Sequence, residues 1–432
     1  MNKKRVNISL LLPVLLLLLV SGCSETSTSK LDTAQTPPPN NDDNSSSCTS
    51  NTTGNTVPAP PTLLPASSYI TAGSPLQNFV AQQAAVATVA ADYSSGAHSL
   101  ISGDNQGNFS ALNNYQPVAN GDLSMAVYGD SFYRIEKMLS GNNIARFAFS
   151  DPQTPIWQYS TNDAGSAVQS NPYDMVFVNS SKAYVLRYNS TKVWIVNPSA
   201  ATEADFKLGE LDLSAYGGDD GIPDMGAAVI ANGRLFILLQ RLEGPTYQVV
   251  NDAYIAVFDT ATDQEIDTGA SCDGFRGIPL RVRNPTGIVY QADSDTLFIR
   301  GSGSFFPVDY SGGIETVDAS TYASKLVLDD SATYGLITGL MPVSANIIYF
   351  VGYRAYNDNT LYVMDINSNQ LAKTRVAALT QGQISDLALD AQGLLWVGDV
   401  AQATVRIIDP ATGNEVASVS TSLNPLKIVF AP

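Results

Sequence analysis

Residues 384–417 read ISDLALDAQGLLWVGDVAQATVRIIDPATGNEVA and contain three short apolar runs separated by turn residues. The runs occupy 387–389, 394–397 and 405–408, and a further strand-like segment begins at 415. Short apolar runs bounded by Asp, Gly, Asn and Pro are typical of strands joined by tight turns. The stretch therefore predicts one antiparallel unit of four strands.

Weaker copies of this unit occur upstream. The exit from the third strand of each unit is marked at 112–114, 149–152, 196–198, 258–260, 317–319, 364–366 and 408–410. From Asp151 to Asp409 the successive markers are 44 to 62 residues apart, which is the repeat length of a β-propeller blade with some longer loops. We therefore predict an all-β fold, a seven-bladed β-propeller of four-stranded antiparallel blades over residues 63–432. A solenoid or a pair of sandwiches is the alternative.

The last strand-like segment predicts how the ring closes. Asn424-Pro425 begins a segment that repeats the start of the first strand in other units, such as 171–177 and 284–289, but no second strand follows it. We expect residues 426–430 to pair with the first unit near 85–93, because closure protects strand edges that would otherwise aggregate. The first unit, residues 63–118, departs most from the repeat pattern.

Composition excludes some partners. The 432 residues carry a formal net charge of −17, with 44% hydrophobic and 15% charged residues. A strongly negative chain lacks the clustered Lys and Arg that nucleic acids and anionic lipid surfaces require. We therefore expect no nucleic-acid partner, membrane contact through a lipid anchor only, and, because like charges repel, a monomer.

The N-terminus has the pattern of an export signal. Residues 1–22 contain a positive segment, Lys3-Lys4-Arg5, and an apolar run from Ile8 to Val20 that is short for a membrane span. The segment ends in Val-Ser-Gly before Cys23 and resembles a bacterial lipobox. The resemblance implies that Cys23 is lipidated and that the chain lies in the bacterial cell envelope, at the outer membrane. An ordinary secretory signal is the alternative.

Residues 23–62 are rich in Ser, Thr, Pro and Asn and have few large apolar residues. Such a segment buries too little apolar surface to offset its ordering entropy, so we expect a disordered tether. Cys48 lies in this tether and Cys272 lies in the repeat region. In an exported protein an even pair of cysteines suggests a disulfide, with two free thiols as the alternative.

Two groups of segments resemble a known family. Residues 254–266 and 405–416 are similar to the YVTN/YncE-type propeller repeat, and residues 171–198 and 212–225 resemble a group of bacterial surface lipoproteins of that type. The resemblance covers about residues 120–432. It implies a propeller fold and an envelope address, but most members of that group have no assigned activity.

One acidic loop is a candidate metal site. Residues 217–224 read GGDDGIPD and resemble the end of a calcium-binding loop, with Asp219, Asp220 and Asp224 as candidate ligands. Calcium takes about six to eight oxygen ligands, and the earlier acidic positions of such a loop are absent here. The alternative is an acidic turn that leads into a strand. We expect no cofactor other than possible calcium.

Four arginines follow second strands and are expected near one rim of the propeller: Arg187, Arg241, Arg300 and Arg354. Arginine binds carboxylates and phosphates through two parallel hydrogen bonds. The set is therefore a candidate anion-binding collar. Structural pairing with acidic residues of the rim is the alternative.

The loops 241–252 and 301–313 are the longest of their class and carry aromatic residues, namely Tyr247, Phe305, Phe306 and Tyr310. Aromatic side chains on protruding loops favour contacts with a protein or glycan partner. The alternative is that these side chains pack back onto the blades.

Several kinds of catalysis have little support. His98 is the only histidine, so zinc sites and Ser-His-Asp triads have at most one candidate, and its place beside a Ser-Ser-Gly turn suggests a surface position. The sequence has no phosphate-binding loop and no paired-cysteine motif. A pair of catalytic carboxylates contributed by different blades stays open.

These observations favour a non-enzymatic envelope lipoprotein whose propeller is a binding scaffold for another envelope or extracellular macromolecule, either a protein or a glycan. The alternative is a calcium-dependent propeller enzyme, lactonase-like or lyase-like, that uses Asp219, Asp220 and Asp224 on the channel rim. The fold by itself does not choose between them.

Overall fold

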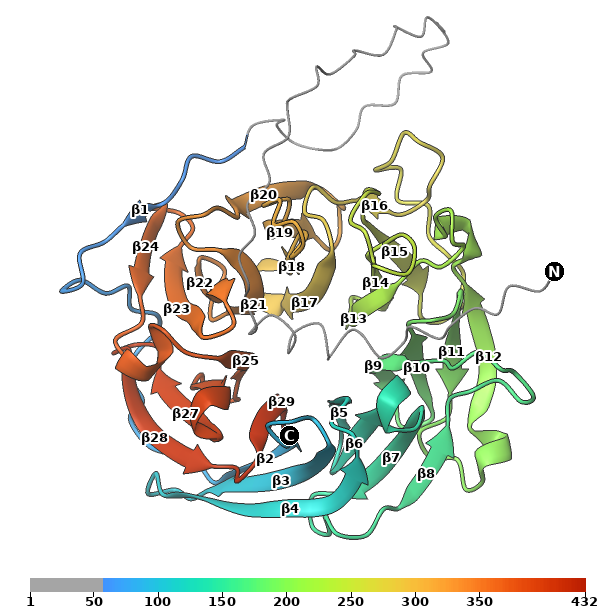
Figure 1. The fold of residues 1–432 in the computed structure, drawn as a ribbon, viewed down its shortest axis with the longest axis horizontal. Coiled ribbons are helices and arrows are strands. Elements are labelled where there is room, and N and C mark those ends of the chain that lie inside the picture. Colours follow the sequence, from blue (N-terminus) through green and yellow to red (C-terminus); the bar gives the residue numbers. More distant parts are fainter. Residues whose placement is uncertain (1–56) are drawn as a thin grey trace, which may run out of the picture. The chain divides into compact units, whose positions relative to one another are not determined.

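The computed structural model describes residues 57–432, and these form seven β-sheets arranged as blades around a central axis (Figure 1). The predicted signal segment at 1–22, Cys23, Cys48 and most of the predicted tether lie outside the described residues. All seven sheets have a core of four antiparallel strands. The predicted fold, a seven-bladed β-propeller, is therefore confirmed.

The strands are given from the innermost to the outermost. Blade 1 contains β29 (Asn424–Phe430), β2 (Gln82–Val89), β3 (Ser95–Gly103) and β4 (Phe109–Ala119). Blade 2 contains β5 (Leu123–Tyr128), β6 (Ser131–Glu136), β7 (Asn143–Ala148) and β8 (Trp157–Ser160). Blade 3 contains β9 (Pro172–Asn179), β10 (Lys182–Arg187), β11 (Lys192–Val196) and β12 (Lys207–Asp212). Blade 4 contains β13 (Met225–Ala231), β14 (Arg234–Leu239), β15 (Tyr254–Asp259) and β16 (Ile278–Pro279).

Blade 5 contains β17 (Pro285–Gln291), β18 (Thr296–Gly301), β19 (Gly313–Asp318) and β20 (Ser324–Asp329). Blade 6 contains β21 (Leu336–Pro342), β22 (Ile347–Ala355), β23 (Asp358–Asp365) and β24 (Gln370–Lys373). Blade 7 contains β25 (Ile384–Leu389), β26 (Leu395–Asp399), β27 (Thr404–Asp409) and β28 (Asn414–Ser420).

The helices of the described residues are short 3₁₀ turns: η2 (Met138–Ser140), η3 (Glu203–Asp205), η4 (Ser214–Tyr216), η5 (Ala292–Ser294), η6 (Ala377–Leu379) and η7 (Val400–Gln402). No helix within residues 57–432 has the length and apolar character needed to cross a bilayer.

The C-terminal strand closes the ring as expected. β29 pairs antiparallel with β2, with Val429 opposite Ala85 and Asn424 opposite Val89. Because β29 takes the innermost position of blade 1, each strand of the first unit lies one place further out than the repeat pattern suggested. Residues 112–114, which were predicted to follow a third strand, therefore lie in the outermost strand, β4. This part of the predicted register was wrong.

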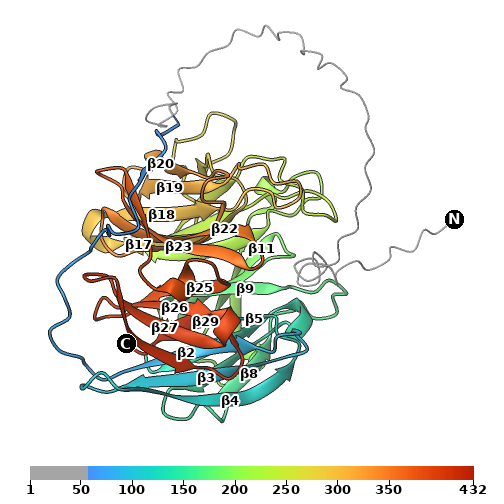
Figure 2. The ribbon, with the colours of Figure 1, turned by 60° about the vertical axis from the view of Figure 1, so that its left-hand side comes forward.

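The segment before β2 follows the outside of the propeller (Figure 2). Its short strand β1 (Thr62–Leu63) lies parallel to β24 of blade 6. Further on, the amide of Ala72 donates to the carbonyl of Pro410, at 3.0 Å, and Val80 and Gln392 exchange hydrogen bonds. The segment thus links the outer parts of blades 6 and 7 to blade 1.

The core lies between neighbouring blades, because each sheet packs a face of apolar side chains against the next. At the junction of blades 7 and 1, for example, Trp396 of β26 is fully buried with Val86 of β2 and Ile428 of β29. The indole nitrogen of Trp396 donates to Asp390 at 2.8 Å, so its polar atom is satisfied inside the core.

His98 was expected at the surface, and this expectation was wrong. It lies in β3 and is fully buried between blades 1 and 2, where its ring packs against Phe132 and Phe147. Its Nε2 lies 2.7 Å from the carbonyl oxygen of Pro152, and its Nδ1 lies 3.2 Å from Nη1 of Arg134. Burial, followed by the charge of Arg134, lowers the pKa of His98 to about 4. The ring is therefore neutral at pH 7 and has a structural role.

Candidate functional site

The candidate site is the face of the propeller where chains enter the inner strands and where second strands turn into third strands. Residues 217–224 lead into β13, residues 241–252 join β14 to β15, and residues 301–313 join β18 to β19. Antiparallel alternation puts these loops at the same end of their blades. All three sequence-predicted loop features therefore share one face.

The inner strands have a common irregularity near this face. In six of the seven described inner strands one extra residue interrupts the pairing with the second strand. The extra residues are Tyr173, Gly226, Thr286, Thr338, Leu426 and, in β25, one of the pair Ser385–Asp386. Such bulges redirect side chains and often lie beside functional sites.

The Asn-Pro signature has a local cause. Asn171 and Asn284 precede β9 and β17 with φ near +50°, and Asp224 precedes β13 with a φ of 53°. Asn and Asp tolerate this left-handed region better than most residues. Asp224 therefore occupies the same turn position as Asn in two other blades. Its left-handed backbone conformation is a structural reason for Asp or Asn at this position.

The carboxylates of two of the three candidate metal ligands accept hydrogen bonds from backbone amides. Asp224 is buried, and its carboxylate accepts a hydrogen bond from the amide of Leu242 at 2.8 Å. Asp220 accepts from the amide of Ile222 at 2.9 Å. Burial raises the pKa of Asp224 to about 8, with smaller contributions from Asp220 and Glu243. The carboxyl group of Asp224 therefore binds its proton more tightly than an exposed aspartate does.

Glu243 links the two loops of blade 4, and sequence reasoning missed it. Its Oε1 accepts from the amide of Asp219 at 2.8 Å and from the side chain of Asn251 at 2.6 Å, and its Oε2 accepts from the amide of Asp220 at 3.3 Å. Across residues 57–432, no three His, Cys, Asp or Glu side chains are grouped so that they could hold a metal ion. Calcium binding at 217–224 stays a prediction with no preformed carboxylate cluster behind it.

A group of tyrosines lies next to this loop. The rings of Tyr173 and Tyr188 stack with centroids 4.3 Å apart, and Tyr247 lies 6.5 Å from Tyr188. Lys137 lies 4.4 Å from the centre of the Tyr173 ring. Burial is the main cause of a raised pKa for all three tyrosines. Tyr247 is therefore half-buried in an aromatic cluster, and Tyr173 and Tyr188 were not singled out from the sequence.

All four predicted collar arginines have structural partners, and three of them lie outside blade 5. Arg187 is buried and forms an ion pair with Asp163 at 2.6 Å, and Arg354 pairs with Asp358 at 2.8 Å. Arg241 donates to the carbonyls of Tyr216 and Asp252, at 2.9 and 3.0 Å. These contacts fit the structural alternative for the three residues. Anion binding by the four arginines as a collar stays a prediction.

Arg300 makes its contacts on the inner strand of its own blade. It belongs to β18, yet its Nη1 donates to the hydroxyl of Thr286 on the inner strand β17 at 2.5 Å. Within residues 57–432 no carboxylate forms an ion pair with it, although Asp386 of blade 7 acts on it electrostatically. The side chain is thus directed at the channel wall.

The loop 301–313 carries the most exposed aromatic tip of the three loops. Phe306, Val308 and Tyr310 are 54%, 49% and 38% exposed. Asp309 fixes the loop by accepting hydrogen bonds from the amides of Ser304 and Ser311, at 2.9 and 3.0 Å. Phe305 instead turns back and contacts Tyr353 of blade 6 edge-on, at 5.5 Å. The loop is therefore an ordered platform with an apolar tip.

Cys272 is disulfide-bonded, whereas Cys48 lies outside the described residues, so the pairing of these two cysteines stays a prediction.

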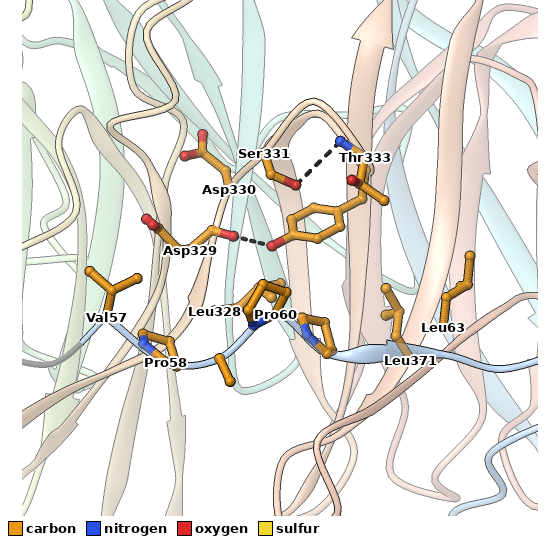
Figure 3. Close-up of a pocket in the computed structure, with 13 residues that line it drawn as sticks. Val57, Pro58, Pro60, Leu63, Leu328, Asp329, Asp330, Ser331, Thr333 and Leu371 are labelled. Carbon is orange, nitrogen blue, oxygen red and sulfur yellow. Dashed lines mark hydrogen bonds between the residues drawn. The ribbon is translucent and has the colours of Figure 1, made fainter.

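A cavity of about 240 Å³ lies between the N-terminal segment and the outer parts of blades 5 and 6 (Figure 3). Its walls include Pro58, Pro60 and Leu371. This cavity lies against the N-terminal segment and not within the three loops of the candidate site.

Comparison with known proteins supports the fold. No family model and no curated protein matches the chain. Among solved structures, a protein from Lactobacillus plantarum has a TM-score of 0.56 at 14% identity, covering 82% of this chain and 100% of that one. The periplasmic gluconolactonase PpgL of Pseudomonas aeruginosa has a TM-score of 0.55 at 13% identity, covering 82% and 99%. Hydrazine synthase of Kuenenia stuttgartiensis has a TM-score of 0.51 at 14% identity, covering 71% and 87%.

The chain is therefore a seven-bladed β-propeller. More particularly, its fold is like that of the solved structures above, one of which is a periplasmic gluconolactonase. At these identities the likeness concerns the fold alone, and similar propellers carry unrelated functions.

Proposed function

We propose that this protein is a lipid-anchored protein of the bacterial outer membrane, whose propeller docks a protein partner through the loop 301–313. The lipid anchor would be Cys23, and the segment 23–62 would hold the propeller away from the membrane. The observation that carries the docking role is the exposed apolar tip formed by Phe306, Val308 and Tyr310.

The tip has the physical properties of a contact surface. Three large apolar side chains within five residues are 38–54% exposed, and their burial by a partner is favourable by about 25 cal/mol per Å² of apolar area. The hydrogen bonds to Asp309 hold the loop in place, so little conformational entropy is lost on binding. Aromatic residues of this kind often contribute most of the energy of an interface.

The experiment compares recovery of partners from intact cells. The full chain with a C-terminal tag is expressed in its source bacterium, crosslinked and captured. It is compared with the double variant Phe306→Ser/Val308→Ser and with Leu112→Ser, which changes an apolar residue of β4 that is 59% exposed. The double variant should recover the partner at least about tenfold less, as expected for loss of interface anchors.

The control variant should recover the same partner as the wild type. Equal recovery by the double variant would overturn docking at the loop 301–313. Recovery of a glycan in place of a protein would replace the protein partner in this proposal.

A further inference from the structure

Arg300 reaches the central channel because of its place in blade 5. It shares a face of β18 with Phe298, since alternate residues of a strand point the same way, and Phe298 packs with Ile337 and Leu340 of blade 6. From this face the side chain extends over the inner strand β17 to the extra residue Thr286. The guanidinium therefore lies beside the innermost strand of blade 5, which borders the central axis.

Gly287 makes this route possible. A Cβ atom at position 287 would lie 2.8 Å from Nε of Arg300 and 3.1 Å from its Cγ. Real Cβ atoms essentially never lie within 3.0 Å of another heavy atom, so the arginine would have to shift to make room for a larger residue. The backbone at 287 has no left-handed φ, which means that this glycine is required for space and not for its conformation.

The positive charge of Arg300 is not matched by a nearby acid. In the described part of the chain it forms hydrogen bonds to the hydroxyl and carbonyl of Thr286 and no ion pair. Asp386, which acts on it, already binds Nζ of Lys427 at 3.1 Å and the amide of Ile428 at 2.8 Å. Burial lowers the pKa of Arg300 to about 10, so it is still a cation at neutral pH.

A polar group without a hydrogen-bond partner lies on the adjacent blade. Thr338 is the extra residue of β21, in the position that Thr286 has in β17. Its hydroxyl is buried and has no hydrogen-bond partner within residues 57–432. A buried hydroxyl without a hydrogen-bond partner and a guanidinium without a paired carboxylate are both unfavourable, so a ligand that satisfied both would be bound favourably.

We propose that the central channel binds a small anion with a carboxylate or phosphate group, held by the guanidinium of Arg300 and the hydroxyl of Thr338. Arginine presents two parallel donors that match two oxygens of such a group. The net charge of −17 keeps anions away from most of the surface, so a local cation is needed to hold one. This site is separate from the loop 301–313 and does not depend on the docking function.

The test measures thermal unfolding of the purified full chain in detergent with sodium phosphate, sodium acetate or sodium chloride at equal ionic strength. A ligand that binds only the folded state raises Tm. We expect phosphate, acetate or both to raise Tm above the chloride value, and the response to each shows which anion group is bound. Arg300→Met should weaken the apparent affinity at least about tenfold, as expected for loss of a charged hydrogen-bond donor.

Two further variants make the test specific. Arg354→Gln removes an exposed arginine that pairs with Asp358, and it should respond as the wild type does. Thr338→Val keeps the shape of the side chain and should weaken the rise in Tm caused by the anion several-fold. If Arg300→Met does not fold, this variant tests whether the anion binds at the proposed site. An undiminished response in Arg300→Met or in Thr338→Val, or no response beyond chloride in the wild type, would overturn the proposal.

Discussion

Gly287 and Arg300 lie on neighbouring strands of blade 5, and the arginine side chain passes through the space that the glycine leaves. The two residues are paired across β17 and β18, and a Cβ atom on residue 287 would lie 2.8 Å from Nε of Arg300. The pair shows how one small residue in an inner strand allows a charged side chain from a second strand to reach the channel.

Replacing Gly287 with alanine should therefore displace Arg300. Overpacking of a well-packed site costs about 1–3 kcal/mol, and we expect Gly287→Ala to lower the free energy of unfolding by this amount in urea denaturation. The matched control is Gly209→Ala in β12, where an added methyl group meets only Ile195, at 3.5 Å. If both variants lose the same stability, the packing of Arg300 over Gly287 is not what makes glycine necessary.

Ring closure by β29 should be visible in a single core substitution. Ile428 is 3% exposed and packs with Trp396 and Val86 at the junction of blades 7 and 1. Truncation of a buried Ile to Ala costs about 2–5 kcal/mol, so Ile428→Ala should lower the free energy of unfolding by about this much. Val416→Ala in β28 removes a side chain that is 37% exposed and should cost well under half as much. Similar losses for the two variants would argue against closure through β29.

His98 should make the protein less stable in acid. Its pKa is about 4 in the folded state, against an ordinary value of 6.5, so the unfolded chain binds the proton more readily. Stability is therefore fully present above about pH 6.5 and is lost as the pH falls toward 4. The charged and titratable groups around the ring are Arg134, the carboxylate of Glu136 that pairs with Arg134, and Tyr115.

The measurement is the free energy of unfolding of the wild type and of His98→Gln at several pH values. A pKa difference of this size corresponds to roughly 3 kcal/mol, at about 1.4 kcal/mol per unit. We expect the wild type to lose about that much more stability than the variant between pH 7 and pH 4. Parallel curves for the two proteins would mean that His98 does not titrate as its burial requires.

The fold could be predicted from the sequence because its signals are local. Turn residues such as those at 390–393 and 409–413 lie beside the strands that they end, and the repeat of these signals gives the number of blades. The C-terminal strand could be predicted because Asn424-Pro425 repeats the start of other inner strands. The predicted register of the first unit was wrong because β29, which takes the innermost position of blade 1, comes from the other end of the chain.

The site could be predicted only in part, because its contacts join residues that are distant in sequence. Glu243 binds the amides of Asp219 and Asp220 from a different loop, and no local pattern reveals this. His98 looked exposed because of the turn that precedes it, whereas its burial depends on Phe132 and Phe147 of the next blade. The loop 301–313 was found because its length and aromatic residues are visible in the sequence.

The most direct test of the central claim, docking through the loop 301–313, places a photo-crosslinking phenylalanine analogue at position 306 of the full chain in its source bacterium. The control places the same analogue at position 112 in β4, where Leu112 is equally exposed, at 59% against 54% for Phe306. The account predicts one discrete protein adduct after illumination from position 306 and none from position 112. The same adducts from both positions, or no adduct from position 306, would contradict it.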